Sequence, residues 1–452
     1  MIRLHDTMAR EKRPFVPGDS KNITLYVCGP TVYGRAHIGN ARPAVVFDTL
    51  ARLIRHHYGP DSLTYARNVT DVDDKIIAAA QKEGVDPSVI TERYERHYLE
   101  DMGALGVIPP DIAPHATQEI PAMIAMIERL IETGHAYEAM GHVLFSVPSD
   151  PDYGGLSRRD REAMLAGARV EVAPYKRDPA DFVLWKPSGE GVVGWDSPWG
   201  RGRPGWHVEC SAMIERHLGE TIDIHGGGLD LIFPHHENEV AQSRCAHGGL
   251  PLARYWVHNG FVDMGSEKMS KSIGNIVTPA ELLETWDGEV LRLALLSAHF
   301  RQPLAWTDEL VREQKKRLDR MYRRAGDAEP SEPDGEFVDA LRDDLNTPAA
   351  LSRLAQIDDP SALKASARMV GLLGRSEKDW FTLRPSPFAN RSTFFSPTTV
   401  GSSDEQIEAR IAERAEAKEN RDFATADRIR EELKAEGIVL EDSASGTTWR
   451  RE

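Results

Sequence analysis

Cysteine is scarce in this sequence of 452 residues, where it occurs only as Cys28, Cys210 and Cys245. Three cysteines so widely separated cannot supply the framework of disulfides that stabilises small secreted domains. The scarcity therefore argues against a disulfide-stabilised extracellular protein and favours a cytoplasmic location, where thiols stay reduced.

Long apolar runs and an excess of basic charge are also missing. Charged residues are spread through the first 15 residues, so we expect neither a signal peptide nor a membrane span there. The 55 Lys and Arg residues are outnumbered by 71 Asp and Glu residues, which gives a formal net charge of -16. This balance argues against a protein that coats nucleic acid without specificity, because phosphate contacts need clustered basic side chains. A local basic surface remains possible, since net charge does not describe patches.

The order of apolar residues predicts the fold class. Ile23, Leu25 and Val27 alternate with other residues and indicate a strand that ends near Cys28, and helical spacing follows it. A second short strand is predicted from Leu63 to Val69, again with a helix after it. Strands that alternate with helices indicate an α/β protein with a Rossmann-like parallel sheet, which binds its ligands at the carboxyl ends of the strands.

Changes of composition divide the chain into segments, because 452 residues are too many for one core. We expect the sheet in two halves, and almost only helices after them. The predicted segments are 1–117 and 205–278 for the halves of the sheet domain, 118–204 for an insertion, 279–325 and 326–384 for two helical regions, 385–404 for a flexible linker rich in Ser, Thr and Pro, and 405–452 for a C-terminal helical unit.

The segment 233–239, FPHHENE, carries the most chemistry for its length. If a helix opens after Pro234, His235 and Glu239 lie one turn apart on the same face. An imidazole nitrogen and a carboxylate oxygen so placed can share a zinc ion, and two thiolates would complete the site. Cys28 and Cys210 are the obvious donors. The spacing alone favours a plainer interpretation, a surface helix pair together with cysteines buried in the core.

Two further segments point to a bound nucleotide. The segment 30–40, PTVYGRAHIGN, stands where the first strand gives way to a helix, and 268–272, KMSKS, stands in a glycine-flanked loop. A strand-to-helix turn offers backbone N–H groups and a positive helix end to phosphates, and loop lysines can stabilise a phosphoryl group as it reacts. In this order the pair resembles the two signatures of class I aminoacyl-tRNA synthetases.

Within that class the chain resembles the cysteinyl-tRNA synthetase family over nearly its whole length. The resembling segments are 26–33 (YVCGPTVY), 67–75 (RNVTDVDDK), 205–213 (GWHVECSAM), 225–231 (HGGGLDL), 233–239 and the lysine loop. The resemblance implies one zinc ion per chain, held by Cys28, Cys210, His235 and Glu239. A zinc ion prefers a soft thiolate to a hydroxyl, so coordination would distinguish cysteine from serine.

The resemblance also assigns the remaining substrate contacts and names the segments. It implies that L-cysteine is joined through an adenylate to the 3′-terminal adenosine of tRNA(Cys), with ATP and Mg²⁺ as the phosphate substrate. Segment 118–204 would be the connective peptide, 279–325 the stem-contact region and 405–452 the anticodon-binding domain. The implied residues are Thr70, Trp206 and Asp230 in the cysteine pocket, His37, Asn40, Lys268 and Lys271 at the phosphates, and Gly226, Gly227 and Gly228 near the adenosine.

Asn40 departs from the family, which usually has a second histidine at that position. An asparagine still offers an NH₂ donor but cannot become cationic.

Candidates for tRNA contact are two basic segments. Arg317 and Arg320 belong to a cluster between 312 and 324, although most charge runs are only solvated faces. Trp449, Arg450 and Arg451 combine an aromatic ring with cations, which suits unpaired bases, and we expect these three to project freely from the last helix pair.

Two other functions would explain part of the same sequence pattern. A ligase that joins activated cysteine to an amino sugar would use the same chemistry but would need no anticodon-binding domain. A paralogue that only binds RNA would not need both lysines, His37 and all four candidate zinc ligands. We expect a monomer.

Overall fold

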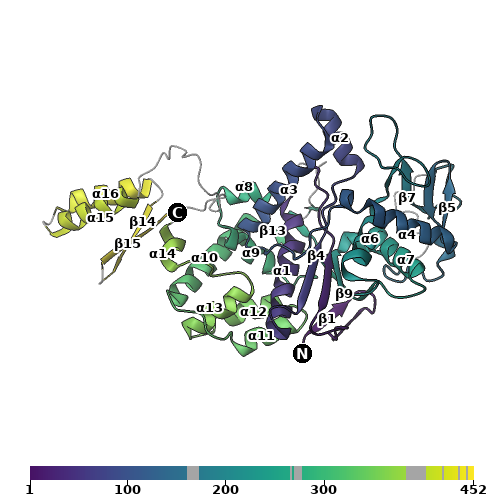
Figure 1. Cartoon of the computed structure of the whole chain (residues 1–452). Helices are drawn as coiled ribbons and strands as arrows, with labels where there is room; N and C mark the ends of the chain where they lie inside the picture. Colours follow the sequence, from purple (N-terminus) through teal and green to yellow (C-terminus); the bar gives the residue numbers. More distant parts are fainter. Residues whose placement is uncertain are drawn as a thin grey trace.

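The main sheet is built on β3 (Ile23–Val27), in which every residue is buried. β4 (Leu63–Arg67) pairs with it in parallel on one side and β9 (Ile222–Gly228) on the other, and β10 (Ala253–Asn259) extends the sheet beyond β9 (Figure 1). The strand order is β10-β9-β3-β4. Because all neighbours are parallel, the carboxyl ends of the strands meet along one edge. The predicted α/β fold with a parallel sheet is confirmed, and strands from both halves of the chain form the sheet.

The structure is a computed structural model that describes residues 1–159, 173–264, 267–268, 277–382, 404–419, 422–435, 438–443 and 446–451. Residues 385–403 of the predicted linker and Lys271 of the predicted lysine loop lie outside these ranges. Among the described residues, no helix combines the length and the apolar character needed to cross a bilayer.

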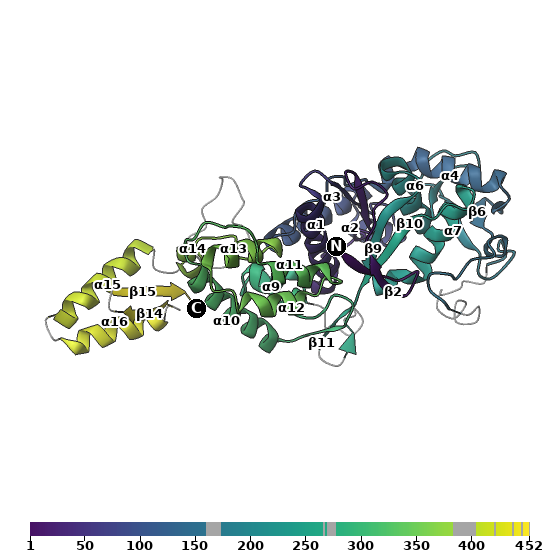
Figure 2. The same cartoon turned by 90° about the horizontal axis from the view of Figure 1, so that it is seen from below.

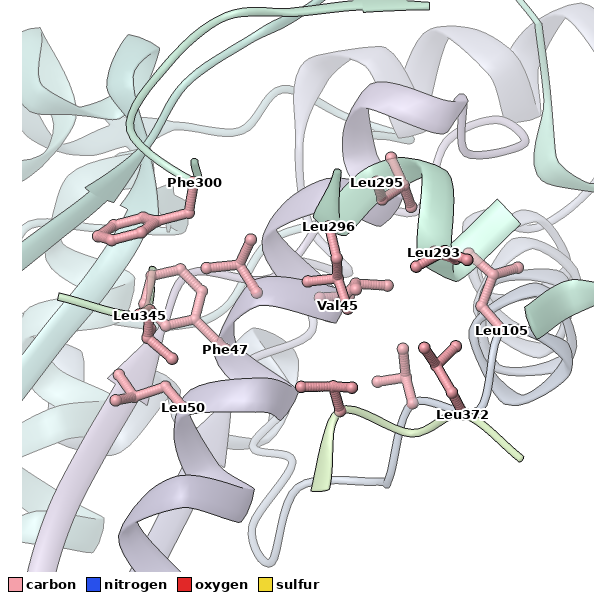
Figure 3. Close-up of a cluster of buried hydrophobic side chains, with 14 of the residues drawn as sticks. Val45, Phe47, Leu50, Leu105, Leu293, Leu295, Leu296, Phe300, Leu345 and Leu372 are labelled. Atoms are coloured by element: carbon pink, nitrogen blue, oxygen red, sulfur yellow. The ribbon is translucent and has the colours of Figure 1, made fainter. Parts of the chain in front are cut away.

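The helix α1 (Ile38–Tyr58) follows β3 and contributes to the largest apolar core, with every residue from Ala44 to Ala51 buried. Figure 3 shows Val45 of α1 beside Leu293 and Leu296 of α9 (Gly288–Leu296), whereas Phe47 and Leu50 lie on another side of α1, beside Leu345. Apolar spacing between 45 and 54 predicted this helix, and its burial against α9 fixes the turn between β3 and α1 to the helical part of the chain.

The insertion interrupts the sheet between β4 and β9. It consists of α4 (Ile120–Glu132) and an antiparallel sheet of β5 (Ala136–Ala139), β6 (His142–Phe145), β7 (Phe182–Pro187) and β8 (Gly202–Pro204). These elements share an apolar core with Val208 of α6 and Ala241 of α7. α6 (Trp206–Leu218) and α7 (Glu237–Ala246) therefore join the insertion to the main sheet.

Helices dominate the chain after the second half of the sheet. They are α8 (Pro279–Leu283), α9, α10 (Asp308–Ala325), α11 (Gly335–Arg342), α12 (Thr347–Leu354), α13 (Pro360–Met369) and α14 (Glu377–Thr382). Several begin with a capping side chain, which satisfies a backbone N–H that the first turn leaves unpaired. Thr307 caps α10 in this way, with its Oγ1 3.1 Å from the N–H of Leu310.

The C-terminal unit lies at the opposite end of the molecule from the insertion in both views (Figures 1 and 2). It contains the helix pair α15 (Asp404–Glu419) and α16 (Phe423–Ala435), followed by a hairpin of β14 (Ile438–Ser443) and β15 (Gly446–Arg451). The predicted apolar face of Ala426, Ile429 and Leu433 is buried. The hairpin was not predicted from the sequence.

Smaller elements complete the description. They are β1 (Arg3–Asp6) and β2 (Glu11–Pro14), the helices α2 (Asp74–Glu83) and α3 (Pro87–Ala104), the strands β11 (Val262–Met264), β12 (Glu267–Lys268) and β13 (Leu304–Trp306), the 3₁₀ turns Ala116–Gln118, Val147–Ser149 and Leu229–Leu231, and the π-helical turn Ile232–His236.

Candidate functional site

The turn between β3 and α1 lies at the carboxyl edge of the main sheet. Gly29 is required in it, because a Cβ there would stand 1.8 Å from the backbone oxygen of Asn68. The Asn68 side chain accepts a hydrogen bond from the Gly29 N–H at 2.8 Å and donates one to Thr70 at 3.1 Å. At the other end of the turn, Asn40 accepts a hydrogen bond from the backbone N–H of His37 at 3.1 Å. Asn40 therefore has a structural role at the helix N-terminus, and its NH₂ group is the part suited to donate to a phosphate.

A cavity of about 450 Å³ opens beside this turn. Its lining includes Cys28, His37, Asn40, Trp206, Gly228 and Asp230. These residues come from α1, α6 and β9 and from the turns that follow β3 and β9, so the parallel sheet brings together segments about 200 positions apart. A cavity at the carboxyl edge of such a sheet is where a doubly wound fold binds its ligand.

The four predicted zinc ligands meet at the edge of this cavity. Their four donor atoms all lie within 4.8 Å of one another. Cys28 Sγ is 3.8 Å from Cys210 Sγ and 3.7 Å from Glu239 Oε1. His235 Nε2 is 2.9 Å from Glu239 Oε1 and 3.6 Å from Cys210 Sγ. The plainer interpretation, a surface helix pair and unrelated cysteines, is wrong, because His235 and Glu239 are buried and face both sulfurs.

The spacing of the two sulfurs fits a shared metal better than a disulfide. A disulfide needs about 2.0 Å between sulfur atoms. Two thiolates on one tetrahedral zinc ion, each at about 2.3 Å, stand about 3.8 Å apart. The four donors comprise two thiols, one imidazole and one carboxylate, a set that suits zinc.

The electrostatics of the cluster favour one shared negative charge on the sulfurs. Burial, together with neighbouring Cys210, raises the pKa of Cys28 well above its usual value. The hydrogen bond from Cys28 lowers the pKa of Cys210 to about 6, although burial opposes this shift. Burial disfavours the charged form of His235, but Glu239 and Cys210 outweigh it and raise the His235 pKa to about 10. A divalent cation would replace these protons, since metal ligands bind deprotonated.

Further rings surround the four donors. His225 Nε2 lies 2.7 Å from the second oxygen of Glu239, and His207 Nδ1 lies 3.0 Å from His235 Nδ1. His236 Nε2 approaches Cys28 Sγ at 3.3 Å. The indole of Trp206 stacks on His235 with ring centroids 4.1 Å apart. These contacts hold both the imidazole and the carboxylate in fixed orientations, as the neighbours of metal ligands commonly do.

Comparison with known proteins agrees with this geometry. Residues 14–316 match the family model of the class I tRNA synthetase (C) catalytic domain, and residues 402–450 match the cysteinyl-tRNA ligase anticodon-binding domain. The chain is 57% identical to the cysteine–tRNA ligase of Parvibaculum lavamentivorans, over 99% of this chain and 97% of that one. It is 54% identical to the cysteine–tRNA ligase of Caulobacter sp., over 99% of each chain.

The chain belongs to the cysteine–tRNA ligase family. It is thus a class I aminoacyl-tRNA synthetase, as the sequence motifs predicted. Among solved structures, methionyl-tRNA synthetase of Mycobacterium tuberculosis with methionyl-adenylate aligns with a TM-score of 0.56 at 16% identity, over 80% of this chain and 93% of that one. A leucyl-tRNA synthetase of Agrobacterium radiobacter in a ternary complex aligns with a TM-score of 0.54 at 12% identity, over 79% of this chain and 83% of that one. At these identities the likeness shows the fold alone.

The remaining residues that the family resemblance assigned to small substrates do not all face the cavity. Trp206 and Asp230 line it, whereas Thr70 is buried behind the turn and hydrogen-bonded to Asn68. Gly228 lines the cavity as well. Gly226 and Gly227 are needed for packing instead, because a Cβ would meet Phe47 at 2.3 Å in the first case and His236 at 2.8 Å in the second.

The predicted phosphate-binding lysines are described only in part. Lys268 lies in β12, where its backbone stands opposite Asp263 in the antiparallel pairing with β11. Lys271 lies outside the described residues.

The structure separates the tRNA candidates on α10. Arg317 donates a hydrogen bond to the backbone oxygen of Leu351, so its guanidinium joins α10 to α12. Arg320 is exposed, as are Arg312 and Lys316 on the same helix. Each of these three residues follows the previous one by four positions, which places them along one face of α10.

The expectation that Trp449 projects freely is wrong. Its ring is buried in the small core of the C-terminal unit, and its indole N–H donates to Glu408 of α15 at 2.8 Å. The alternation of β15 turns Trp449 inward against the helix pair, and a helix-and-tail interpretation could not show this. Arg450 and Arg451 belong to the same strand.

Sequence reasoning missed several histidines around the four donors, namely His207, His225 and His236, and His258 behind His236. His225 and His258 stand in the buried strands β9 and β10. A histidine that is buried in a strand needs a polar partner, and that signal could have marked both.

Proposed function

We propose that this chain charges tRNA(Cys) with L-cysteine in two steps. Cysteine first reacts with ATP to form cysteinyl-adenylate and pyrophosphate, and the cysteinyl group then passes to the 3′-terminal adenosine. The observation that carries the proposal is the convergence of Cys28, Cys210, His235 and Glu239 beside a cavity at the nucleotide turn.

The four donors would hold one zinc ion. Bound there, zinc would coordinate a thiolate far better than a hydroxyl and so would select cysteine over serine. The chain's own residues then orient the rest of the substrate. Asp230 lines the cavity and offers a carboxylate to the α-ammonium group, and Trp206 closes the side next to His235. Selection by direct coordination would make a proofreading site unnecessary.

The phosphates of ATP, bound with Mg²⁺, would lie at the N-terminus of α1. The backbone N–H groups of the first turn and the helix dipole favour negative charge there. His37, the residue that precedes α1, lines the cavity and would donate to a phosphate oxygen during attack by the cysteine carboxylate. Lys268 and Lys271 would neutralise the departing pyrophosphate. No covalent enzyme intermediate is required, because positioning and charge stabilisation suffice.

The tRNA would contact two parts of the chain. The exposed face of α10 (Arg312, Lys316 and Arg320) would meet the phosphate backbone, and the C-terminal unit would meet the anticodon. The buried Trp449 would support the second surface from behind, while Arg450 and Arg451 remain candidates for direct contact. We place the enzyme in the cytoplasm, where its three free cysteines would stay reduced, and we expect it to act as a monomer.

A ligase that joins cysteine to an amino sugar remains the second candidate. The match of residues 402–450 to an anticodon-binding domain favours tRNA as the acceptor.

The test separates activation from transfer. Cysteine-dependent ATP–pyrophosphate exchange and charging of purified tRNA are measured on the full chain and on a chain that lacks residues 405–452. We expect exchange to survive the truncation and charging to fall steeply, mainly at low tRNA concentration. Charging that is unaffected would remove the anticodon role and favour the second candidate, and an absence of exchange in the full chain would refute cysteine activation.

Two sets of point variants refine the test. Lys271→Ala should slow single-turnover adenylate formation by about 2–4 kcal/mol in the barrier, with little effect on cysteine binding. Lys316→Ala/Arg320→Ala should raise the KM for tRNA and leave exchange unchanged. The matched control is Lys82→Ala/Arg96→Ala, an exposed pair on α2 and α3 that should alter neither measurement.

A further inference from the structure

A file of polar side chains at hydrogen-bond distance from one another runs from the N-terminal segment to Cys28, and its two histidines are buried. Thr7 Oγ1 lies 2.8 Å from His258 Nδ1, His258 Nε2 lies 2.8 Å from His236 Nδ1, and His236 Nε2 lies 3.3 Å from Cys28 Sγ. Thr7 follows β1, His258 belongs to β10 and His236 precedes α7. The file therefore links the first residues of the chain to a predicted metal ligand across the sheet.

The file is held firmly in place. His236 and His258 are 0% and 2% exposed. The backbone N–H of Thr7 donates to the Trp256 oxygen at 2.8 Å, which fixes the threonine against β10. The His236 ring packs closely against Gly227, because a Cβ on that glycine would stand 2.8 Å from the ring.

The partners of the two rings determine where their protons lie. In the described part of the chain, the hydrogen-bond partners recorded for His236 and His258 are each other, a thiol and a hydroxyl. The Glu239 carboxylate lies within 4.8 Å of His236 but is hydrogen-bonded to His225 and His235 instead. A buried imidazolium without an acidic partner is costly, so each ring is neutral and carries one N–H. A sulfur that binds a metal is a thiolate and can only accept. His236 must then donate from Nε2 and accept at Nδ1, His258 must donate from Nε2 and accept at Nδ1, and Thr7 must donate its hydroxyl proton.

We propose that Thr7, His258 and His236 form a hydrogen-bond file that donates to the Cys28 thiolate and holds it as a metal ligand. This inference rests on the proposed zinc site. Thr7 acts through two other residues and is a positioning residue.

The proposed direction of the file is compatible with only one of two overlapping sets of ligands. Besides the predicted set, Cys28, His225, His236 and Glu239 bring donor atoms within 4.8 Å of one another. His236 could ligate only through a lone pair on Nε2, which requires the opposite direction of every hydrogen bond in the file. The donating direction removes this lone pair and leaves the metal to Cys210 and His235.

The test uses the full chain with zinc bound and measures metal affinity, not only activity. Thr7→Val keeps the shape but removes the hydroxyl, whereas Thr7→Ser keeps the hydroxyl. Zinc dissociation constants are measured by competition with a chromogenic chelator. We expect Thr7→Val to weaken zinc binding about 10-fold, as the loss of a group that supports a metal ligand commonly does, and Thr7→Ser to stay close to the parent. Thr133→Val, which loses a hydroxyl bonded to Arg129 far from the site, is the matched control and should leave the affinity unchanged.

A spectroscopic readout tests the hydrogen bond itself. In the cobalt(II)-substituted chain, a hydrogen bond lowers the energy of the sulfur lone pair, so its loss in Thr7→Val should move the sulfur-to-cobalt charge-transfer band to longer wavelength. Thr7→Ser should restore the parent band.

The outcomes distinguish this inference from the zinc site on which it rests. If the parent binds zinc and Thr7→Val changes neither the affinity nor the band, the file is overturned and the zinc site stands. A parent chain that binds no zinc would overturn both. Equal losses in Thr7→Val and Thr7→Ser would show a packing effect and overturn the file as well.

Discussion

Two buried clusters of ionisable groups lie in the catalytic part of the chain, and they are built on opposite principles. Around Arg292, every charge has a permanent partner. Its guanidinium donates to the Asp48 carboxylate and to the backbone oxygens of Val370, Leu105 and Gly106. Asp48 in turn accepts from Arg52 and from the backbone N–H of Ile108. Each charged group in this cluster therefore has a protein partner of opposite charge, and we call it the closed cluster. It ties α1 to α9 and to the loops beside them.

The cluster around Cys28 is also buried, but its donor atoms have no such permanent partner of opposite charge in the part of the chain that the structure describes, and we call it the open cluster. Two sulfurs and a carboxylate converge with only imidazoles as partners, and no lysine or arginine is recorded at hydrogen-bond distance from the four donors in the described residues. Convergent acceptors without a permanent cation are expensive to bury unless a metal joins them. The comparison therefore distinguishes a structural cluster, which contains its own counter-charge, from a binding site, which needs a metal cation to supply that charge.

The largest effect should follow from removing a sulfur of the open cluster. Cys28→Ser or Cys210→Ser should lower zinc affinity by at least about 100-fold and abolish cysteine activation with it, because hydroxyls are poor zinc ligands. Metal analysis and pyrophosphate exchange check both effects. Cys245→Ser is the control, since Cys245 lies outside the cluster, and it should keep zinc and activity. Active enzyme of the Cys210 variant without zinc would contradict the account.

The difference between the clusters also explains what the sequence could reveal. His235 and Glu239 are one helical turn apart and adjacent to a recognisable motif, so spacing and family resemblance together predicted the open cluster. Arg292 stands inside an apolar helix far from Asp48 in sequence, and no local pattern predicts that the two meet. The same holds for Trp449: its inward direction depends on a hairpin whose register is set by packing against α15 and α16, and the basic tail suggested an exposed ring instead.

Removing a charge from the closed cluster should lower the stability of the fold without changing the zinc content. Arg292→Met leaves the Asp48 carboxylate buried without its partner and should lower the free energy of unfolding by about 3–5 kcal/mol. Thermal unfolding and metal analysis together measure this, and zinc content should stay at the parent level. Adding Asp48→Leu should recover part of the loss. Lys12→Met, which removes a solvent-exposed ion pair with Asp343, should cost less than about 1 kcal/mol. A loss of zinc in folded Arg292→Met would remove the distinction between the clusters.

A neighbour of the closed cluster should show an intermediate effect. Tyr322 of α10 donates to Glu289 of α9 at 2.9 and 3.0 Å, and burial raises the pKa of this carboxyl. Tyr322→Phe should cost about 1.5–3 kcal/mol, the usual range for a hydrogen bond to a charged group. Denaturant unfolding measures the loss. Tyr58→Phe, which loses a long hydrogen bond of 3.4 Å from the hydroxyl to the Phe15 oxygen, is the control and should change stability little. Equal effects in the two variants would show that the Glu289 contact adds nothing.

The smallest effect belongs to a pair that water reaches. His115 lies 3.0 Å from Glu95, and this hydrogen bond raises the pKa of His115 although partial burial opposes the shift. Because the folded pKa is above the usual 6.5, the pair should contribute stability below that pH and lose it as the pH rises through the folded value. His115→Gln should therefore cost less than about 1 kcal/mol near pH 6 and almost nothing near pH 9. A loss that grows with pH in unfolding experiments would contradict the assigned direction.

The open cluster is tested most directly by substituting cobalt(II) for zinc in the full chain and adding amino acids. A sulfur-to-cobalt charge-transfer band reports each thiolate on the metal. The account predicts that L-cysteine strengthens this band in a saturable way, that L-serine leaves it unchanged, and that neither has an effect in Cys210→Ser. A band that ignores cysteine, or responds equally to serine, would show that the cluster does not select the substrate sulfur.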